Sequence, residues 1–322
     1  MKFIFSGYLK SGETIALYNV SRNIKYKRLD YYSIPNPSYV TLGDGYIYTY
    51  DKTSSAITLH SYLVKGEEMI IVDKKDIPGT NVTHLQYSPK NEVLFGCSYH
   101  DGTFFGIKVK EGMFGELIVY QKQIKDERLS RCHQVLLNKE ETELAVINIA
   151  LDAIYFYDIT NNKIRYKDII ALPEGCGPRH GIYYGELLYI ITEYSNEIHV
   201  INRYNKETLQ VISTIPNYTG TSYGATLLFS SDYQYLYASN RGEDTIAKFK
   251  VLDNHMLEYE NSIPVGGKHP RHMILTNDDK YLISCNKDSN NITIINVHKE
   301  EVVASIPFGE PTGVIEILDE EI

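Results

Sequence analysis

The chain has 322 residues, 43% of them hydrophobic, and a formal net charge of −9. This acidic balance argues against a non-specific nucleic-acid-binding protein, because phosphate contacts need a basic surface. No apolar stretch approaches the length of a membrane span, and the N-terminal apolar run is too short for a secretion signal. We therefore expect a cytoplasmic protein that contacts neither membrane nor nucleic acid, with its four cysteines as free thiols.

Short apolar runs bounded by Gly, Asn, Asp, Ser and Pro recur from the N-terminus to the C-terminus. This pattern is typical of β-strands, and no long segment with helical periodicity competes with it. Tyr is abundant, at 28 residues, and Trp is absent. Aromatic and β-branched residues suit pleated, half-buried strands, so the sequence indicates an all-β fold.

The strands belong to an internal repeat. The phrase "THLQYSPKNEVLFGCSYHDGTFFGIKV" has a counterpart in "CHQVLLNKEETELAVINIALDAIYFYDI", and "ATLLFSSDYQYLYASNRGEDTIAKFKV" has one in "RHMILTNDDKYLISCNKDSNNITIINV". Alignment on one repeat position gives seven units, with the following residues at that position: Tyr39, His84, His133, His180, Thr226, His272 and Gly313. Units of about 40 to 50 residues predict the four-stranded blades of a seven-bladed β-propeller.

The last unit is truncated, and the first two strands of the chain have no unit before them. We therefore expect the N-terminal strands to complete the C-terminal sheet, which leaves no free edge between the first and last blades. No linker or low-complexity segment interrupts the repeat. A single propeller domain over residues 1–322 is the resulting prediction.

A second set of equivalent positions lies at the end of the second strand of each unit and includes Glu193, Arg241, Asn286 and Lys287. In a propeller the two sets should open onto the same face. We therefore expect one funnel to contain a group of polar side chains from several blades: His133, Arg179, His180, Glu193, Arg241, Arg271, His272, Asn286 and Lys287.

The phrases "GPRH" and "HPRH" place Arg179 and Arg271 directly before a histidine. Arginine is costly to bury without an anion, and its planar guanidinium suits a carboxylate or a phosphate. These arginines are therefore candidates for an anion site, with an inter-blade salt bridge as the alternative. Glu193 could be a general base or simply the partner of Arg241, and His84 could equally well be a structural inter-blade residue.

A metal site is less favoured by the sequence than an anion site or a salt bridge. The histidines stand on different blades, and no His-x-His or Glu-x-x-His spacing occurs. The sequence also lacks a G-x-S-x-G turn, a G-x-G-x-x-G loop and a P-loop. We expect neither a metal nor a cofactor.

Five phrases of the chain are distinctive: "CHQVLL", "GPRH", "TEYSNEI", "YLYASNRGEDTIAKFKV" and "HPRHMILTNDDKYLISCNKDSNNITII". They resemble the seven-bladed propeller lactonase family, which includes propeller-type 6-phosphogluconolactonases and a carboxymuconate-lactonizing enzyme. The resemblance covers nearly the whole chain. It implies a catalytic set of one histidine, two arginines and one glutamate, which fall here on His133, Arg179, Glu193 and Arg241.

The resemblance implies hydrolysis of a small anionic sugar lactone, with 6-phosphogluconolactone as the favoured substrate. Glu193 or His133 would be the base, the arginines would bind the carbonyl and an anionic group, and four further residues would help bind the substrate: His180, Arg271, His272 and Asn286. Two alternatives stay open, namely cycloisomerization of a carboxylated dienoate and a non-catalytic binding propeller. The family often has a carboxylate where Asn148 stands in "NIALD", and this departure favours the second alternative. The sequence does not indicate an oligomeric state.

Overall fold

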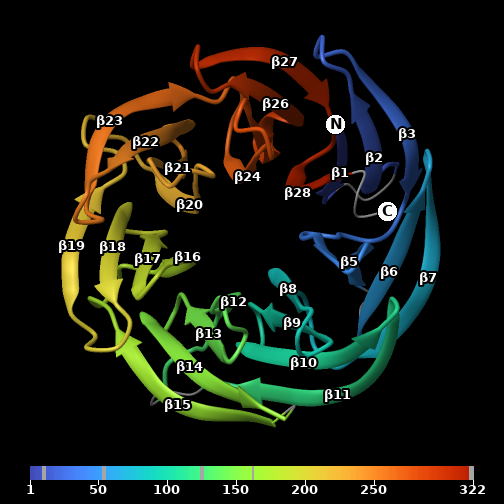
Figure 1. The fold of residues 1–322 in the computed structure, drawn as a ribbon, viewed down its shortest axis with the longest axis horizontal. Helices are drawn as coiled ribbons and strands as arrows, with labels where there is room; N and C mark the ends of the chain where they lie inside the picture. Colours follow the sequence, from blue (N-terminus) through green and yellow to red (C-terminus); the bar gives the residue numbers. More distant parts are fainter. Residues whose placement is uncertain (9–11, 53–55, 124–126, 162, 319–322) are drawn as a thin grey trace. The chain divides into compact units, whose positions relative to one another are not determined.

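The computed structural model describes residues 1–8, 12–52, 56–123, 127–161 and 163–318. The strands form seven four-stranded antiparallel sheets, and the fold is an all-β seven-bladed propeller, as the repeat predicts (Figure 1). We number the blades in chain order from the sheet that begins at residue 41, so that blade 7 contains both ends of the chain. Two compact units can be distinguished, residues 1–171 with 312–322 and residues 172–311.

The first unit holds blades 7, 1, 2 and 3. Blade 7 consists of β28 (Pro311–Ile317), β1 (Lys2–Gly7), β2 (Ile15–Val20) and β3 (Tyr26–Tyr32). Blade 1 consists of β4 (Thr41–Gly43), β5 (Tyr46–Lys52), β6 (Ile57–Lys65) and β7 (Glu68–Ile77). Blade 2 consists of β8 (His84–Ser88), β9 (Val93–Ser98), β10 (Thr103–Lys110) and β11 (Met113–Lys122). Blade 3 consists of β12 (Cys132–Leu137), β13 (Glu143–Asn148), β14 (Ala153–Thr160) and β15 (Lys163–Ala171).

The second unit holds blades 4, 5 and 6. Blade 4 consists of β16 (Pro178–Tyr184), β17 (Leu187–Thr192), β18 (Glu197–Asn202) and β19 (Thr208–Ser213). Blade 5 consists of β20 (Tyr223–Phe229), β21 (Tyr235–Arg241), β22 (Thr245–Val251) and β23 (Leu257–Pro264). Blade 6 consists of β24 (Pro270–Leu275), β25 (Tyr281–Asn286), β26 (Asn291–Asn296) and β27 (Glu301–Pro307), with the short 3₁₀ helix η1 (Lys287–Ser289) after β25.

The expected closure of the last blade is confirmed. β28, from the C-terminal end of the chain, is hydrogen-bonded to β1 in the sheet order β28-β1-β2-β3. Gly313 permits this close approach, since a Cβ there would lie 2.5 Å from the Ser6 hydroxyl oxygen. The N-terminal strands therefore complete the truncated final repeat and remove the edge at which another chain could pair.

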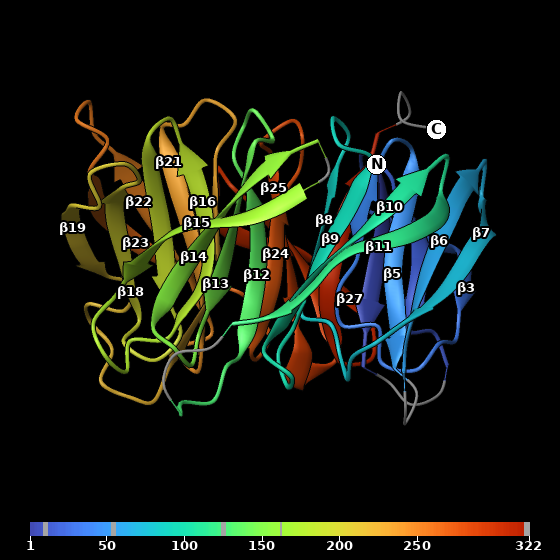
Figure 2. The same cartoon turned by 90° about the horizontal axis from the view of Figure 1, so that it is seen from below.

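Burial follows the order of strands within each blade. The second strands β9, β13 and β17 are buried at every position, whereas the fourth strands β11, β15 and β19 are mostly exposed. Figure 2 shows β12, β13 and β14 side by side in blade 3. A strand covered on both faces is largely apolar, which explains the apolar runs of the repeat.

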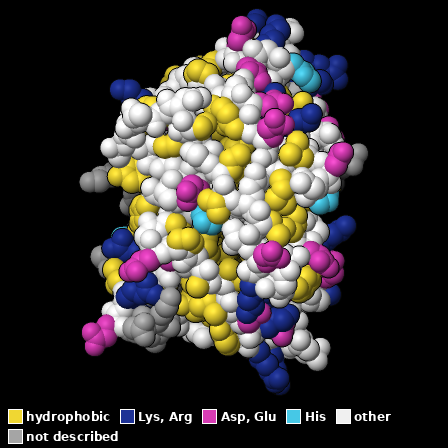
Figure 3. Space-filling view, turned by 90° about the vertical axis from the view of Figure 1, so that its left-hand side faces the viewer, with side chains coloured by type: hydrophobic (Ala, Val, Ile, Leu, Met, Phe, Trp, Pro, Cys, Tyr) yellow, Lys and Arg dark blue, Asp and Glu magenta, His cyan; other side chains and the backbone are white. Residues whose placement is uncertain are grey.

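One face of the surface is mixed in character. Acidic, basic and hydrophobic side chains are interspersed over the face seen in Figure 3. Through the described ranges, the structure contains no helix that is long and apolar enough to cross a membrane. All four cysteines are buried, reduced thiols.

β-Bulges interrupt the first strands of three blades at the same point. In β16, Pro178 pairs with Thr192 and His180 with Ile191, so Arg179 is the extra residue. Arg271 is the extra residue of β24, and His133 is the extra residue of β12. A bulge bends the strand and redirects a side chain, and bulges are common beside active sites.

The bulges correct one detail of the sequence alignment. His133 is equivalent to Arg179 and Arg271, not to His180 and His272, so the alignment is one residue out of register in blade 3. The error arises because a bulge adds one residue without changing the apolar pattern around it. The repeat period alone does not reveal which residue is inserted.

Candidate active site

The candidate site lies in the second unit, where the ends of two strands and one bulge meet. Arg179 emerges from the bulge of β16, Glu193 follows β17 directly, and Arg241 ends β21. These three residues come from blades 4 and 5. Their convergence is one part of the arrangement expected from the repeat.

Glu193 forms ion pairs with both arginines through a single carboxylate oxygen. Its Oε2 lies 2.8 Å from an Nη atom of Arg241 and 3.0 Å from the Nε of Arg179. The second contact is an ion pair without the geometry of a hydrogen bond. The arginine side chains are only 6% and 2% exposed, whereas that of Glu193 is 17% exposed and remains within reach of solvent. The pair of Glu193 and Arg241, which was the alternative to a general base, is thus present and joins blades 4 and 5, whereas Arg179 pairs with Glu193 within blade 4.

The irregular start of β20 fixes the two guanidinium groups. Arg241 donates a hydrogen bond to the carbonyl oxygen of Gly224 at 2.8 Å, and Arg179 donates one to the carbonyl oxygen of Ala225. These carbonyls are available because the ladder between β20 and β21 is irregular between Gly224 and Leu227. Glycine is required at 224, since a Cβ would lie 2.3 Å from the carbonyl oxygen of Thr192.

The two arginines stabilise the negatively charged form of Glu193. Burial alone raises the pKa of Glu193, but Arg241 and Arg179 lower it more, so the carboxyl has a pKa below its ordinary value. Burial lowers the pKa of Arg179 well below the ordinary value, and the nearby Arg241 and Arg271 lower it further. One carboxylate therefore offsets only part of the cost of burying these cations. Within the described ranges, the buried Nε of Arg241 has no hydrogen-bond partner.

Two of the expected substrate-binding residues lie close to these charges. Burial, Arg179 and Arg271 together lower the pKa of His272 to about 4, which places this histidine near both arginines and keeps it neutral at pH 7. Arg271 also lowers the pKa of Glu193 and of Arg241. The bulge residue of blade 6 thus belongs to the same electrostatic cluster as that of blade 4.

The other two expected binding residues have structural contacts. His180 is buried, with its Nδ1 3.3 Å from the hydroxyl of Thr226 on the next blade. Asn286 is fully buried, accepts a hydrogen bond from Ser284 at 2.9 Å and donates one to Thr293 at 3.0 Å. Its amide therefore braces the end of β25. A direct role for either residue in substrate binding stays a prediction.

His84 shows the same inter-blade contact in the first unit. Its Nε2 lies 3.0 Å from the hydroxyl of Tyr39, the equivalent residue of the preceding blade. Side chains at this repeat position therefore link neighbouring blades. This agrees with the structural interpretation of His84.

His133 lies in the first unit, so its convergence with the three residues of blades 4 and 5 stays a prediction. It is buried, and its ring makes an edge contact with Tyr99 at 6.2 Å between centroids. Asn148 belongs to a neutral network instead. Its Nδ2 donates to Gln123 and to Ser130, in each case at 2.8 Å.

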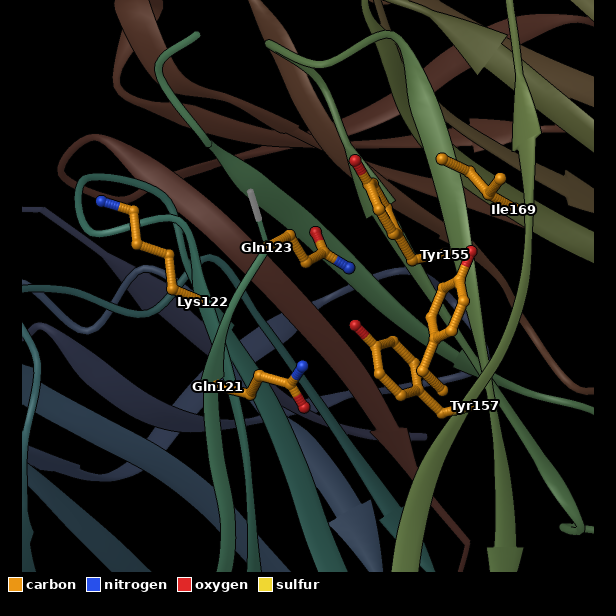
Figure 4. Close-up of a pocket in the computed structure, with 7 residues that line it drawn as sticks. Gln121, Lys122, Gln123, Tyr155, Tyr157 and Ile169 are labelled. Atoms are coloured by element: carbon orange, nitrogen blue, oxygen red, sulfur yellow. The ribbon is translucent and has the colours of Figure 1, made fainter. Parts of the chain in front are cut away.

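A separate cavity of about 510 Å³ lies between the end of β11 and the β14–β15 hairpin (Figure 4). Its lining is neutral apart from one lysine and consists of Gln121, Lys122, Gln123, Tyr155, Tyr157, Tyr166 and Ile169. The Oε1 of Gln123 accepts hydrogen bonds from Asn148 and from the Cys132 thiol at 2.8 and 3.0 Å. Among the residues with described positions, no group of three His, Cys, Asp or Glu side chains is arranged to hold a metal ion.

The sequence analysis missed His269 and Asp288. His269 Nδ1 lies 3.2 Å from an Asp288 oxygen, and Lys287 Nζ lies 2.9 Å from the other oxygen. Burial first, and Arg241 next, lower the pKa of His269 to about 4. Their signal was present in "HPRH" and "CNKD", because His269 precedes the bulge and Asp288 follows the second strand.

The fold is a propeller, and the charged strand ends of blades 4 and 5 form a candidate site for an anion. Residues 2–314 match the family described as "Lactonase, 7-bladed beta-propeller". The chain therefore belongs to the seven-bladed β-propeller lactonase family.

Individual relatives are distant. The chain is 23% identical over 286 residues to a 6-phosphogluconolactonase of Bacillus subtilis, a match that covers 82% of this chain and 81% of that protein. Among solved structures, a Lactobacillus plantarum protein matches with a TM-score of 0.89 at 22% identity, over 98% of this chain and 99% of that chain. A periplasmic gluconolactonase of Pseudomonas aeruginosa matches with a TM-score of 0.89 at 17% identity and the same coverage. At these identities the structural matches show the fold alone.

Proposed function

We propose that the protein hydrolyses a sugar lactone with an anionic substituent, and that 6-phosphogluconolactone is its substrate. Family membership and the Bacillus subtilis relative support a lactonase-type hydrolase. The observation that carries the proposal is the pair of buried arginines on the single carboxylate of Glu193. Such a site is short of negative charge, and an anionic lactone supplies that charge.

In the proposed reaction a water molecule attacks the lactone carbonyl and negative charge develops on the carbonyl oxygen. Arg179 and Arg241 are held in place by the carbonyls of Ala225 and Gly224. Their N–H groups therefore need no reorientation to donate to the developing oxyanion, which is the main requirement for its stabilisation. The ring C–O bond then breaks, the ring oxygen takes up a proton, and the product is an open-chain carboxylate.

The base that accepts the proton from water is Glu193 or His133. Glu193 is ionised at neutral pH, but its lowered pKa makes it a weak base while both arginines contact it. An anionic substrate that engages one arginine weakens that contact, which raises the pKa of Glu193 towards the range useful for general-base catalysis. His133 takes the base role if Glu193 only positions the arginines.

A non-catalytic anion-binding propeller is the second candidate. The specific observation in its favour is the closed Arg179–Glu193–Arg241 ion-pair group, which holds the carboxylate in its least basic form. Such a protein would bind the lactone or its acid product without turnover. Both candidate functions explain why the arginines would attract an anion. Only kinetic measurements can therefore distinguish an enzyme from a binding protein.

The deciding experiment measures hydrolysis of 6-phosphogluconolactone by wild-type protein, by Glu193→Gln and by Glu197→Gln. Glu197 is a matched control, because it lies in the same blade but pairs with His199. The enzyme proposal expects turnover by the wild type and by Glu197→Gln, with a large loss for Glu193→Gln. Wild-type protein no faster than buffer, yet able to bind the product acid, would replace the enzyme by a binding protein.

A further inference from the structure

Blade 6 carries a second set of cations that the proposed reaction does not use. Arg271 occupies the bulge of β24, between the pairs Pro270–Asn286 and His272–Cys285. Arg179 occupies the equivalent bulge of β16. Because the same backbone irregularity directs both side chains, Arg271 emerges from blade 6 at the point where Arg179 emerges from blade 4.

The segment around Arg271 is fixed by its backbone. His269 adopts a left-handed conformation with φ of 62°, which is uncommon for a residue other than glycine. Its N–H donates to the carboxylate of Asp244 on blade 5 at 2.8 Å, and its carbonyl accepts from the N–H of Lys287 at 3.0 Å. The loop before β24 is thereby tied both to the preceding blade and to the turn after β25.

This turn brings a further cation to the same end of blade 6. Asp288 contacts the ring of His269 at 3.2 Å and the ammonium group of Lys287 at 2.9 Å. The side chain of Lys287 is 25% exposed, so a ligand can reach it. Arg271 and Lys287 both lower the pKa of His269. All three groups therefore share one electrostatic environment.

The charges of the whole cluster do not balance. Arg179, Arg241, Arg271 and Lys287 are cations. The carboxylates beside them are those of Glu193, Asp288 and Asp244. His269 and His272 add no charge at neutral pH, because each has a pKa of about 4. Among these seven charged residues one positive charge remains, in a chain whose net charge is −9. This excess attracts an anionic group such as a phosphate monoester.

We propose that Arg271 and Lys287 form a second anion subsite that binds the non-reacting phosphate of the substrate. The proposal rests on the proposed function, since it assumes that the lactone carbonyl is held by Arg179 and Arg241. The proposal assigns different parts of the substrate to different blades. Blades 4 and 5 act on the reacting carbonyl, and blade 6 recognises the phosphate. Without substrate, Lys287 forms an ion pair with Asp288. The phosphate replaces Asp288 as the partner of Lys287 when the substrate binds.

Kinetics on two substrates test the subsite. For Lys287→Met, the ratio of kcat/KM for 6-phosphogluconolactone to kcat/KM for glucono-1,5-lactone should fall about tenfold, the usual effect of losing one charge-assisted contact. Lys280→Met is the matched control, because Lys280 is also in blade 6 and also pairs with an aspartate, Asp278, at 2.7 Å. Its ratio should stay at the wild-type value. An unchanged ratio for Lys287→Met would overturn the subsite.

A third substrate tests whether the subsite recognises a phosphate or a carboxylate. With a lactone that carries a carboxylate in place of the phosphate, Lys287→Met should lose less activity than with 6-phosphogluconolactone, because a carboxylate has only one charge. A larger loss on the carboxylate substrate would contradict recognition of phosphate.

Binding of inorganic phosphate, measured by isothermal titration calorimetry, separates this inference from the proposed function. Phosphate should bind wild-type protein and Lys280→Met about tenfold more tightly than Lys287→Met. If the wild type binds phosphate in this way but hydrolyses neither lactone, the enzyme proposal fails and the subsite stands. Equal binding by all three proteins rejects the subsite even if the protein is an active lactonase.

Discussion

The charged cluster of blades 4 to 6 and the tyrosine-lined cavity of blades 2 and 3 are both built on four-stranded blades. They differ in how far their buried polar and charged groups are compensated by partners. Around Arg179, buried cations exceed the carboxylates that face them. Around Gln123, buried amide, hydroxyl and thiol groups satisfy one another, and the cavity of about 510 Å³ has one lysine at its rim. The candidate site and the cavity therefore lie in different blades. Uncompensated buried charge, held by strand bulges, is the more informative feature.

Among single substitutions, Glu193→Gln should produce the largest change in activity. The substitution removes the charge that both arginines contact, and we expect kcat for lactone hydrolysis to fall by about 10² or more, as for loss of a general base. Substrate binding should persist, because Arg179 and Arg241 then face an amide and are freer to bind an anion. Steady-state kinetics check both parts. A variant with wild-type kcat would transfer the base role to His133.

Acid should destabilise the protein through His272. Its pKa is about 4 in the folded protein, below the ordinary value of 6.5. Since the unfolded chain binds the proton more readily, stability is greatest above the ordinary pKa and falls as the pH decreases towards 4. This group alone should account for about 2 kcal/mol of lost unfolding free energy between about pH 7 and pH 5.

Urea unfolding of wild-type protein and His272→Gln at both pH values measures this contribution. The variant should lose less stability on acidification than the wild type. An identical pH dependence for the two proteins would mean that the ring of His272 is not held in its neutral form by Arg179 and Arg271.

Arg241→Ala should act on binding. The guanidinium contacts both Glu193 and the carbonyl of Gly224, and its loss removes one of the cations that attract the substrate. KM should rise about tenfold, and the increase of KM with added salt should become less steep than in the wild type. Arg165→Ala, on the exposed strand β15, is the control. A wild-type KM would contradict a binding role for Arg241, whereas a fall in kcat beside the rise in KM is expected from its proposed contact with the oxyanion.

Gln123→Leu should have the smallest effect. In contrast to the substitutions in the candidate site, it should lower stability and leave activity almost unchanged. Its Oε1 accepts from Asn148 and Cys132, and their loss should cost about 1 kcal/mol of stability or somewhat more. Lactone hydrolysis by the folded variant should remain within about twofold of wild type. Thermal unfolding and steady-state kinetics measure the two effects. A loss of activity comparable to that of Glu193→Gln would connect the cavity to catalysis.

The sequence predicted the fold well because a propeller repeats one structural unit. Seven aligned phrases predicted seven blades, and the truncated last phrase predicted that β1 would join β28. The pattern also brought Glu193 and Arg241 together, since both directly follow or end a second strand. Such positions depend only on strand order, which the apolar periodicity of the sequence records.

The rest depended on features that the repeat does not record. The bulges shift a side chain by one residue, so His133 was aligned with His180 although it corresponds to Arg179. His269 and Asp288 were missed because their contact requires a left-handed backbone at His269 and the turn of η1. The segment at His269 is held by hydrogen bonds to Asp244 of blade 5 and to Lys287 of the η1 turn, and the apolar periodicity of the strands does not predict such contacts.

The central claim is that Arg179 and Arg241 act together on an anionic lactone. The most direct test is the rate of 6-phosphogluconolactone hydrolysis by wild-type protein and by the Arg179→Ala/Arg241→Ala double variant, with folding checked by circular dichroism. Wild-type protein should exceed the spontaneous rate, and the double variant should lose about 10³-fold or more in kcat/KM, the scale of removing oxyanion stabilisation together with anion binding. A folded double variant that is as active as the wild type would contradict the claim.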